Sequence, residues 1–185
     1  SGTSYGKMNF YESGTVVMPA GKNSQGTFET YMQFVGLGSG LSGKTITAAT
    51  LNAYENSGGA KDQKLTLYKA AKSWSVTGLT YNNRPGSTGS ALGTVTSTKT
   101  TGKLHSFNVL PYVQGVASGS ADYGLVLKNT TSTPSYASFY GSRCSTASKR
   151  PNLTVTYTEI SSEATNVSVS PAYVKSSTQA AVSWQ

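Results

Sequence analysis

Residues 152–158 have the sequence Asn-Leu-Thr-Val-Thr-Tyr-Thr, in which apolar and polar side chains alternate at every position. Successive side chains of a β-strand point to opposite faces of the sheet, so this pattern predicts a half-buried strand. Leu153, Val155 and Tyr157 are expected to face the core, and the threonines to face solvent. This period of two, repeated along the chain, decides the fold class.

Similar runs of β-branched and aromatic residues recur, separated by segments rich in Gly, Ser, Asn and Pro such as 36–43, 56–59 and 84–89. One short helix is predicted at Leu110–Ala117, with Pro111 in its first turn, where a missing N–H is harmless. About ten short strands predict an all-β fold, an antiparallel two-sheet β-sandwich that is jelly-roll-like. Besides 152–159 the strands are expected at Glu29–Val35, Thr45–Glu55, Lys64–Lys69, Leu92–Ser97, Lys103–Val109, Tyr123–Lys128 and Tyr136–Ser142, with less regular alternation at Lys7–Tyr11 and Gly14–Met18.

The composition excludes several classes of protein. Only 12% of the 185 residues are charged and 36% are hydrophobic, without the Ala, Glu, Lys and Leu richness of a helical bundle. Because no run of about 18 apolar residues is present, membrane insertion is not predicted. A single cysteine, Cys144, cannot form an internal disulfide. The formal net charge of +8 favours polyanionic partners such as acidic polysaccharide, teichoic acid or nucleic acid.

The composition changes after Glu159. Residues 160–165 are predicted to be a linker, and residues 166–185 resemble the first strands of a fibronectin type III-like module. We therefore expect two units, a β-sandwich over residues 1–159 and a linker with the start of a second module over 160–185. The chain begins at Ser1 and looks like a piece of a longer protein, so we expect a monomeric module of a multidomain chain.

A family resemblance rests on one segment and on the order of others. Ser73-Trp74-Ser75, followed by Leu79-Thr80-Tyr81-Asn82-Asn83-Arg84-Pro85, resembles the signature of the DNRLRE-type domains. Other segments agree with the family in the same order, and together they cover most of residues 28–158; they are Tyr31–Phe34, Ile46–Tyr54, Ser106–Val109, Tyr112–Val113, Tyr123–Lys128, Ala137–Tyr140 and Arg150–Tyr157. The chain departs from the pattern at Gln33 and Val35, where the family often has Arg and Asp.

The resemblance implies a jelly-roll type sandwich and a non-catalytic module of secreted, cell-surface or cell-wall-associated bacterial proteins. Some members of the family are carbohydrate-binding modules, including alginate binders. The resemblance therefore predicts a polysaccharide or cell-wall polymer as the partner.

No catalytic residue is predicted. A glycosidase needs two carboxylates flanking the sugar bond, and the spacing of the acidic residues suggests no such pair. His105, the only histidine, alternates with inward-facing Phe107 and is interpreted as a packed or hydrogen-bonded residue. Cys144 is interpreted as a small buried hydrophobe. One His and one Cys cannot form a zinc site, so no metal site is predicted; calcium, which takes oxygen ligands, stays open as an alternative.

Outward-facing tyrosines flanked by basic residues form the candidate ligand-binding set. Aromatic rings stack on sugar C–H groups, while Lys and Arg pair with uronate or phosphate groups. The set comprises Tyr54, Tyr68, Lys69, Tyr136, Tyr140, Arg143 and Arg150. In contrast, Asn82, Asn83 and Arg84 are interpreted as structural turn residues, and Trp74 as a core residue.

The first hypothesis is a non-catalytic carbohydrate- or cell-wall-binding module that prefers anionic glycan. The alternative is a structural spacer module of an adhesin or stalk, with no ligand of its own. A nucleic-acid partner is not predicted, because the basic residues are scattered and no recognition motif is present.

Overall fold

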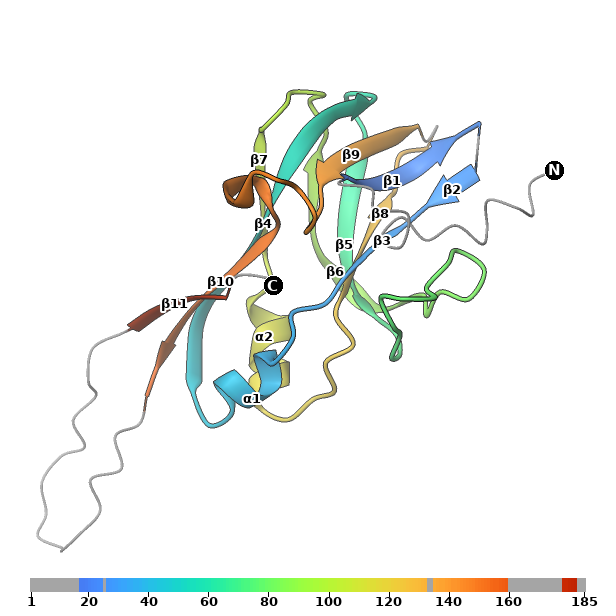
Figure 1. Ribbon diagram of the computed structural model, residues 1–185. Helices are drawn as coiled ribbons and strands as arrows, with labels where there is room; N and C mark the ends of the chain where they lie inside the picture. The colour runs from blue at the N-terminus through green and yellow to red at the C-terminus, as the bar shows by residue number, and fades with distance from the viewer. Residues whose placement is uncertain (1–16, 25, 133–134, 160–177, 183–185) are drawn as a thin grey trace, which may run out of the picture.

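A computed structural model describes residues 17–24, 26–132, 135–159 and 178–182 (Figure 1). Strands dominate these ranges, and Pro111 lies in the first turn of the predicted helix α2. The elements are β1 (Val17–Asn23), β2 (Gly26–Phe28), β3 (Thr30–Met32), α1 (Leu37–Leu41), β4 (Thr45–Gly59), β5 (Lys64–Ala70), β6 (Ser87–Thr96), β7 (Leu104–Asn108), α2 (Leu110–Ala117), β8 (Leu125–Asn129), β9 (Tyr136–Tyr140), the 3₁₀ turn η2 (Ala147–Lys149), β10 (Asn152–Thr158) and β11 (Thr178–Val182).

The larger sheet is built around the long strand β4. Its first part pairs with β10 on one edge, its last part pairs with β9 on the same edge, and β7 pairs with its other edge. Strands β1 and β2 extend the sheet beyond β9, and β11 extends it beyond β10. All of these pairings are antiparallel, and together they make a seven-stranded sheet.

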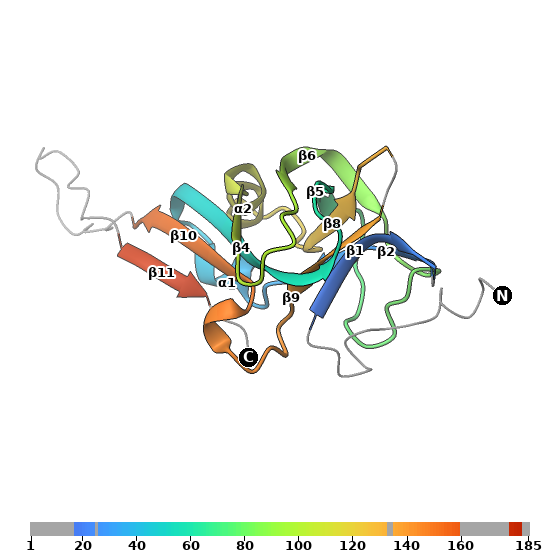
Figure 2. The same cartoon turned by 90° about the horizontal axis from the view of Figure 1, so that it is seen from above.

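The smaller sheet has four antiparallel strands in the order β3-β8-β5-β6. Figure 2 shows β5, β6 and β8 as a layer separate from β9 and β1. The inward side chains of both sheets and of the two helices form one core, which includes Leu51, Leu67, Phe107, Val113, Leu127, Phe139 and Leu153. The protein is therefore an all-β sandwich of two antiparallel sheets, as the period of two predicts.

The predicted faces are confirmed for most strands. Leu153 and Val155 are fully buried and Tyr157 is 8% exposed, while the threonines between them are half-buried. Trp74 is the exception. Its indole is only half-buried, because it lies in the loop after β5, where its Nε1 donates to the carbonyl oxygen of Tyr123 at 2.7 Å. The prediction that Trp74 belongs to the core is wrong.

Several elements differ from the sequence prediction. The segment 36–43, interpreted as a separator, contains α1, whose Leu37 and Leu41 are buried. Strand β6 begins at Ser87, inside another predicted separator, and β1 begins at Val17. The predicted strand at 7–11 and most of the one at 14–18 lie outside the described residues.

The predicted boundary after residue 159 falls beside a gap in the description, since residues 160–177 lie outside it. The backbone of β11 pairs with β10 from Thr178↔Tyr157 to Val182↔Leu153. The division into a sandwich and the start of a fibronectin-like module stays a prediction. No helix within the described ranges is both long and apolar enough to cross a membrane.

Candidate ligand-binding faces

A row of side chains crosses four neighbouring strands on the outer face of the seven-stranded sheet. Leu104 of β7 pairs with Tyr54 of β4, and Tyr140 of β9 pairs with Val17 of β1. Glu55 of β4 pairs with Phe139 of β9. Because the two strands are antiparallel, continuing this register by one residue places Tyr54 opposite Tyr140. Directly opposed residues have Cβ atoms about 4.5–5.5 Å apart. We call Leu104, Tyr54, Tyr140 and Val17 the tyrosine strip.

The strip is partly exposed, and buried residues lie beneath it. Leu104 is 43% exposed, and Tyr54 and Tyr140 are half-buried. Their chain neighbours point inward, where Phe139 and Glu55 are fully buried. The tyrosines therefore present one side to solvent while the strands beneath them are fixed by the core.

A lysine lies over one ring of the strip. The Nζ of Lys149, in η2, is 5.2 Å from the centroid of the Tyr140 ring, within the range of a cation–π contact. A Cβ atom on Gly102 would lie 3.9 Å from Cε of Lys149. The loop between β6 and β7, which carries exposed Lys99 and Lys103, therefore borders the same place.

The two predicted arginines lie in the loop that connects β9 with β10. Arg150 donates through Nε to the carbonyl oxygen of Cys144 at 2.8 Å, so it closes this loop on itself. Arg143 is exposed, and Cys144 is a buried free thiol, as predicted. The loop starts directly after Tyr140, so Arg143 lies three residues from that tyrosine along the chain, and Arg150 directly follows Lys149.

A buried carboxylate organises the neighbouring loop. Glu55 is fully buried, and its oxygens accept hydrogen bonds from the backbone N–H of Thr98 at 2.9 Å, from the Thr98 hydroxyl at 2.8 Å and from the backbone N–H of Lys99. His105 Nε2 lies 2.8 Å from Oε2, and its ring packs edge-on against Phe139. The interpretation of His105 as a packed, hydrogen-bonded residue is confirmed.

These contacts set the ionisation of Glu55. Burial alone raises the pKa of the carboxyl group, but the hydrogen bonds from His105, Thr98 and Lys99 outweigh it. The pKa of Glu55 therefore lies below its ordinary value, and the carboxylate form holds the loop that carries Lys99 and Lys103.

The structure divides the predicted set between two sheets. Tyr54 and Tyr140 come together, but Tyr136 is four residues from Tyr140 on the same face of β9, about 13 Å away at about 3.3 Å per residue. Buried Ser138 lies between them. Tyr68 and Lys69 belong to β5 of the smaller sheet, where Tyr68 pairs with Val126 and Lys69 with Leu125.

Sequence analysis missed several members of this region, among them Leu104 and Lys149. Leu104 alternates with inward-facing His105 and Phe107 in the pattern, so its outward direction was available from the sequence. Lys149 is half of the only adjacent basic pair, Lys149-Arg150. Its position over Tyr140 depends on how the loop after β9 folds, and no local pattern predicts that.

The Tyr-Asn-Asn-Arg-Pro segment has the structural contacts that the sequence interpretation assigns to it. The Asn83 side chain accepts from the backbone N–H of Thr80 at 2.7 Å and donates to the carbonyl oxygen of Gly78 at 2.8 Å. Arg84 donates to the Tyr81 carbonyl oxygen at 2.6 Å, and its guanidinium lies 3.6 Å from the centroid of the Tyr81 ring. This segment is therefore a folded loop with internal hydrogen bonds.

Basic side chains predominate around the strip. Every acidic side chain of the described ranges already has a partner within the protein: Glu29 with Arg84 and Lys128, Glu55 with His105, Asp62 with Lys61, Asp122 with the Tyr112 hydroxyl and the Gly124 N–H, and Glu159 with Lys44. The net charge of +8 is therefore carried by basic groups such as Lys99, Lys103 and Lys149. In the described part of the chain, no three His, Cys, Asp or Glu side chains gather into a metal-binding group.

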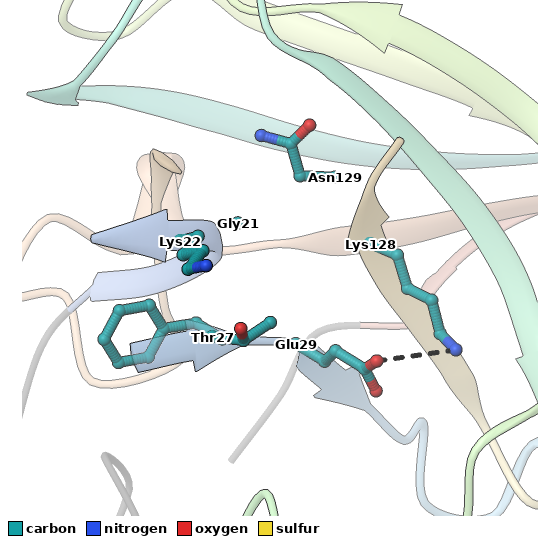
Figure 3. A pocket seen from close by; sticks show the side chains of 7 residues that line it. Gly21, Lys22, Thr27, Glu29, Lys128 and Asn129 are labelled. Carbon is teal, nitrogen blue, oxygen red and sulfur yellow. Dashed lines mark ion pairs between the residues drawn. The ribbon is translucent and has the colours of Figure 1, made fainter. Parts of the chain in front are cut away.

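A small depression opens between the two sheets (Figure 3). Lys128 and Glu29 form an ion pair at 3.5 Å on one wall. Its volume is about 130 Å³, below the roughly 300 Å³ at which ligand pockets begin. This depression is therefore smaller than an ordinary ligand pocket. The lining residues are Gly21, Lys22, Thr27, Phe28, Glu29, Lys128 and Asn129.

Comparison with known families assigns the sandwich to one of them. The model of carbohydrate-binding module family 96 matches residues 1–157 of the chain. The chain belongs to this family. Family 96 is a family of binding modules, which fits the absence of a predicted catalytic pair, and its match spans the sandwich from β1 to β10. No curated protein matches the chain.

Proposed function

We propose that this family 96 module binds an anionic polysaccharide along the tyrosine strip. The observation that carries the proposal is the adjacency of Tyr54 and Tyr140 on an open sheet face, with Lys149 over the Tyr140 ring. Rings on a flat face suit a polymer, because successive sugars can stack while the chain continues past both ends of the site.

The basic side chains near the strip support a negatively charged ligand. Lys149, Lys99 and Lys103 border the strip, and Arg143 and Arg150 lie in the loop that begins after Tyr140. Exposed Lys and Arg pair with uronate carboxylates or phosphates, whereas a neutral glucan gives them no counter-charge. We therefore propose a uronate-type or teichoic-type polymer as the ligand of a secreted or surface-attached protein.

Titration calorimetry with alginate, polygalacturonate and a neutral glucan tests this at low and high salt. Charge pairing between exposed groups is screened within about 8 Å at physiological ionic strength, so affinity for the two acidic polymers should fall as salt rises. Stacking depends on desolvation and dispersion, so a residual affinity should persist in high salt and should fall clearly in Tyr140→Ala.

A matched control is Tyr123→Ala, which removes an exposed tyrosine from the loop before β8 on the other sheet. It should bind like the unaltered protein. Equal affinity for all three polymers would exclude the anionic preference. Absence of binding to all of them would favour the alternative, a spacer module without a ligand.

A further inference from the structure

The outer face of the smaller sheet carries a second aromatic row. Tyr31 of β3 and Tyr68 of β5 both pair with Val126 of β8, which places the two tyrosines on either side of it and on one face. Val126 is fully buried and both tyrosines are half-buried. Two strand spacings of about 4.8 Å separate Tyr31 from Tyr68. We call Tyr31 and Tyr68 the second row; Val126 lies buried between them.

The second row is held rigidly at one end. The Tyr31 hydroxyl donates to Glu29 at 2.9 Å, and its ring packs edge-to-face on Trp74 with 5.7 Å between centroids. Trp74 is fixed in turn by its bond to the Tyr123 carbonyl oxygen. Aromatic groups that are already ordered lose little conformational entropy when a ligand stacks on them.

This row also has an excess of positive charge beside it. One carboxylate, Glu29, contacts two cations, Arg84 at 3.0 Å and Lys128 at 3.5 Å. The cluster therefore keeps one uncompensated positive charge. A uronate carboxylate of a sugar on the second row would supply the missing negative charge at this end.

We propose that the second row is a separate binding site for acidic polysaccharide, so that one module bridges two polymer chains. This inference rests on the proposed function. The two rows belong to different sheets whose inner faces share one core, so they face opposite sides of the sandwich (Figure 2). One straight stretch of polymer cannot contact both.

Calorimetric stoichiometry with a short oligogalacturonate tests the proposal directly. The unaltered protein should bind two oligomers, Tyr68→Ala should bind one, the double variant Tyr54→Ala/Tyr140→Ala should bind one, and the combination of all three changes should bind none. The control Val35→Ala, at a position that is 83% exposed, should still bind two. Long polygalacturonate mixed with the unaltered protein should scatter light strongly, and either single-face change should abolish that scattering.

A second variant covers the case in which Tyr68→Ala unfolds the sheet. Lys128→Gln removes one cation while Glu29 keeps its contact with Arg84, so the loop contacts survive. It should weaken one of the two oligomer sites at least threefold and leave the other unchanged. A stoichiometry of one in the unaltered protein, lost only in the Tyr54→Ala/Tyr140→Ala variant, would overturn the second site and keep the proposed function. No binding at all would overturn both.

Discussion

At the scale of single residues, the clearest determinant is the fully buried Glu55 carboxylate. It joins β4 to the loop between β6 and β7 through Thr98, Lys99 and His105. Hydrogen bonds to a charged group contribute about 1.5–3 kcal/mol, and a buried acceptor that loses its donors costs a comparable amount. Glu55 therefore contributes to the stability of the sandwich and to the place of Lys99 and Lys103.

We expect the contribution of Glu55 to the free energy of unfolding to depend on pH. Because its pKa is lower in the folded protein than the ordinary value of 4.5, the unfolded chain takes up the proton first as pH falls. Its contribution is therefore complete well above pH 4.5 and is lost as pH falls through the folded-state pKa. Urea unfolding between pH 7 and pH 3 should show a steeper loss of stability for the unaltered protein than for Glu55→Gln, and parallel curves would contradict this.

A second prediction at this scale concerns Phe139, which is fully buried and packs against the His105 ring. Phe139→Ala should lower the free energy of unfolding by about 3–5 kcal/mol, because the core cannot close over the lost ring. The adjacent Tyr140→Ala, on the outer face, should cost clearly less. Denaturant midpoints measure both, and equal losses would mean that the face assignment of β9 is wrong.

At the scale of elements, the local sequence pattern predicted the strands. Pairing between strands far apart in the chain determines which outward side chains lie together. The alternation within Thr45–Glu55 and Tyr136–Ser142 gave the correct outward direction for Tyr54 and Tyr140. It could not tell that β4 lies beside β9 while β5 lies in another sheet, because strand pairing depends on contacts between residues far apart in the chain. Helix α1 escaped prediction because Gly38 and Gly40 in it are typical of loops.

The close approach of the backbone before β8 to the end of β3 depends on Gly124. It has a φ of +79°, and a Cβ atom there would lie 2.3 Å from the Met32 carbonyl oxygen. Gly119 also has a positive φ, +95°, but a Cβ there would meet nothing within 4 Å. Gly119→Ala should cost only the strain of its backbone, about 1 kcal/mol, and Gly124→Ala clearly more. Equal denaturant midpoints for the two variants would contradict the close approach.

At the scale of the whole molecule, the excess of positive charge should make binding of an anionic polymer depend on salt more strongly than thermal stability does. The core is apolar and the acidic groups are already paired, so raising salt from low to physiological concentration should shift the melting temperature only slightly. The association rate with a polyuronate should fall severalfold over the same range, because steering by exposed charges is screened. Stopped-flow binding and thermal melts at matched salt concentrations separate the two effects.

The position of β10 in the interior of its sheet also bears on mechanical load. Pairs from Asn152↔Asn52 to Thr158↔Thr45 connect it to the long strand β4. Tension on the chain beyond Val182 acts first on β11, which pairs with β10 from Thr178↔Tyr157 to Val182↔Leu153. The ladder between β10 and β4 should therefore be loaded from this side only after β11 has separated from β10.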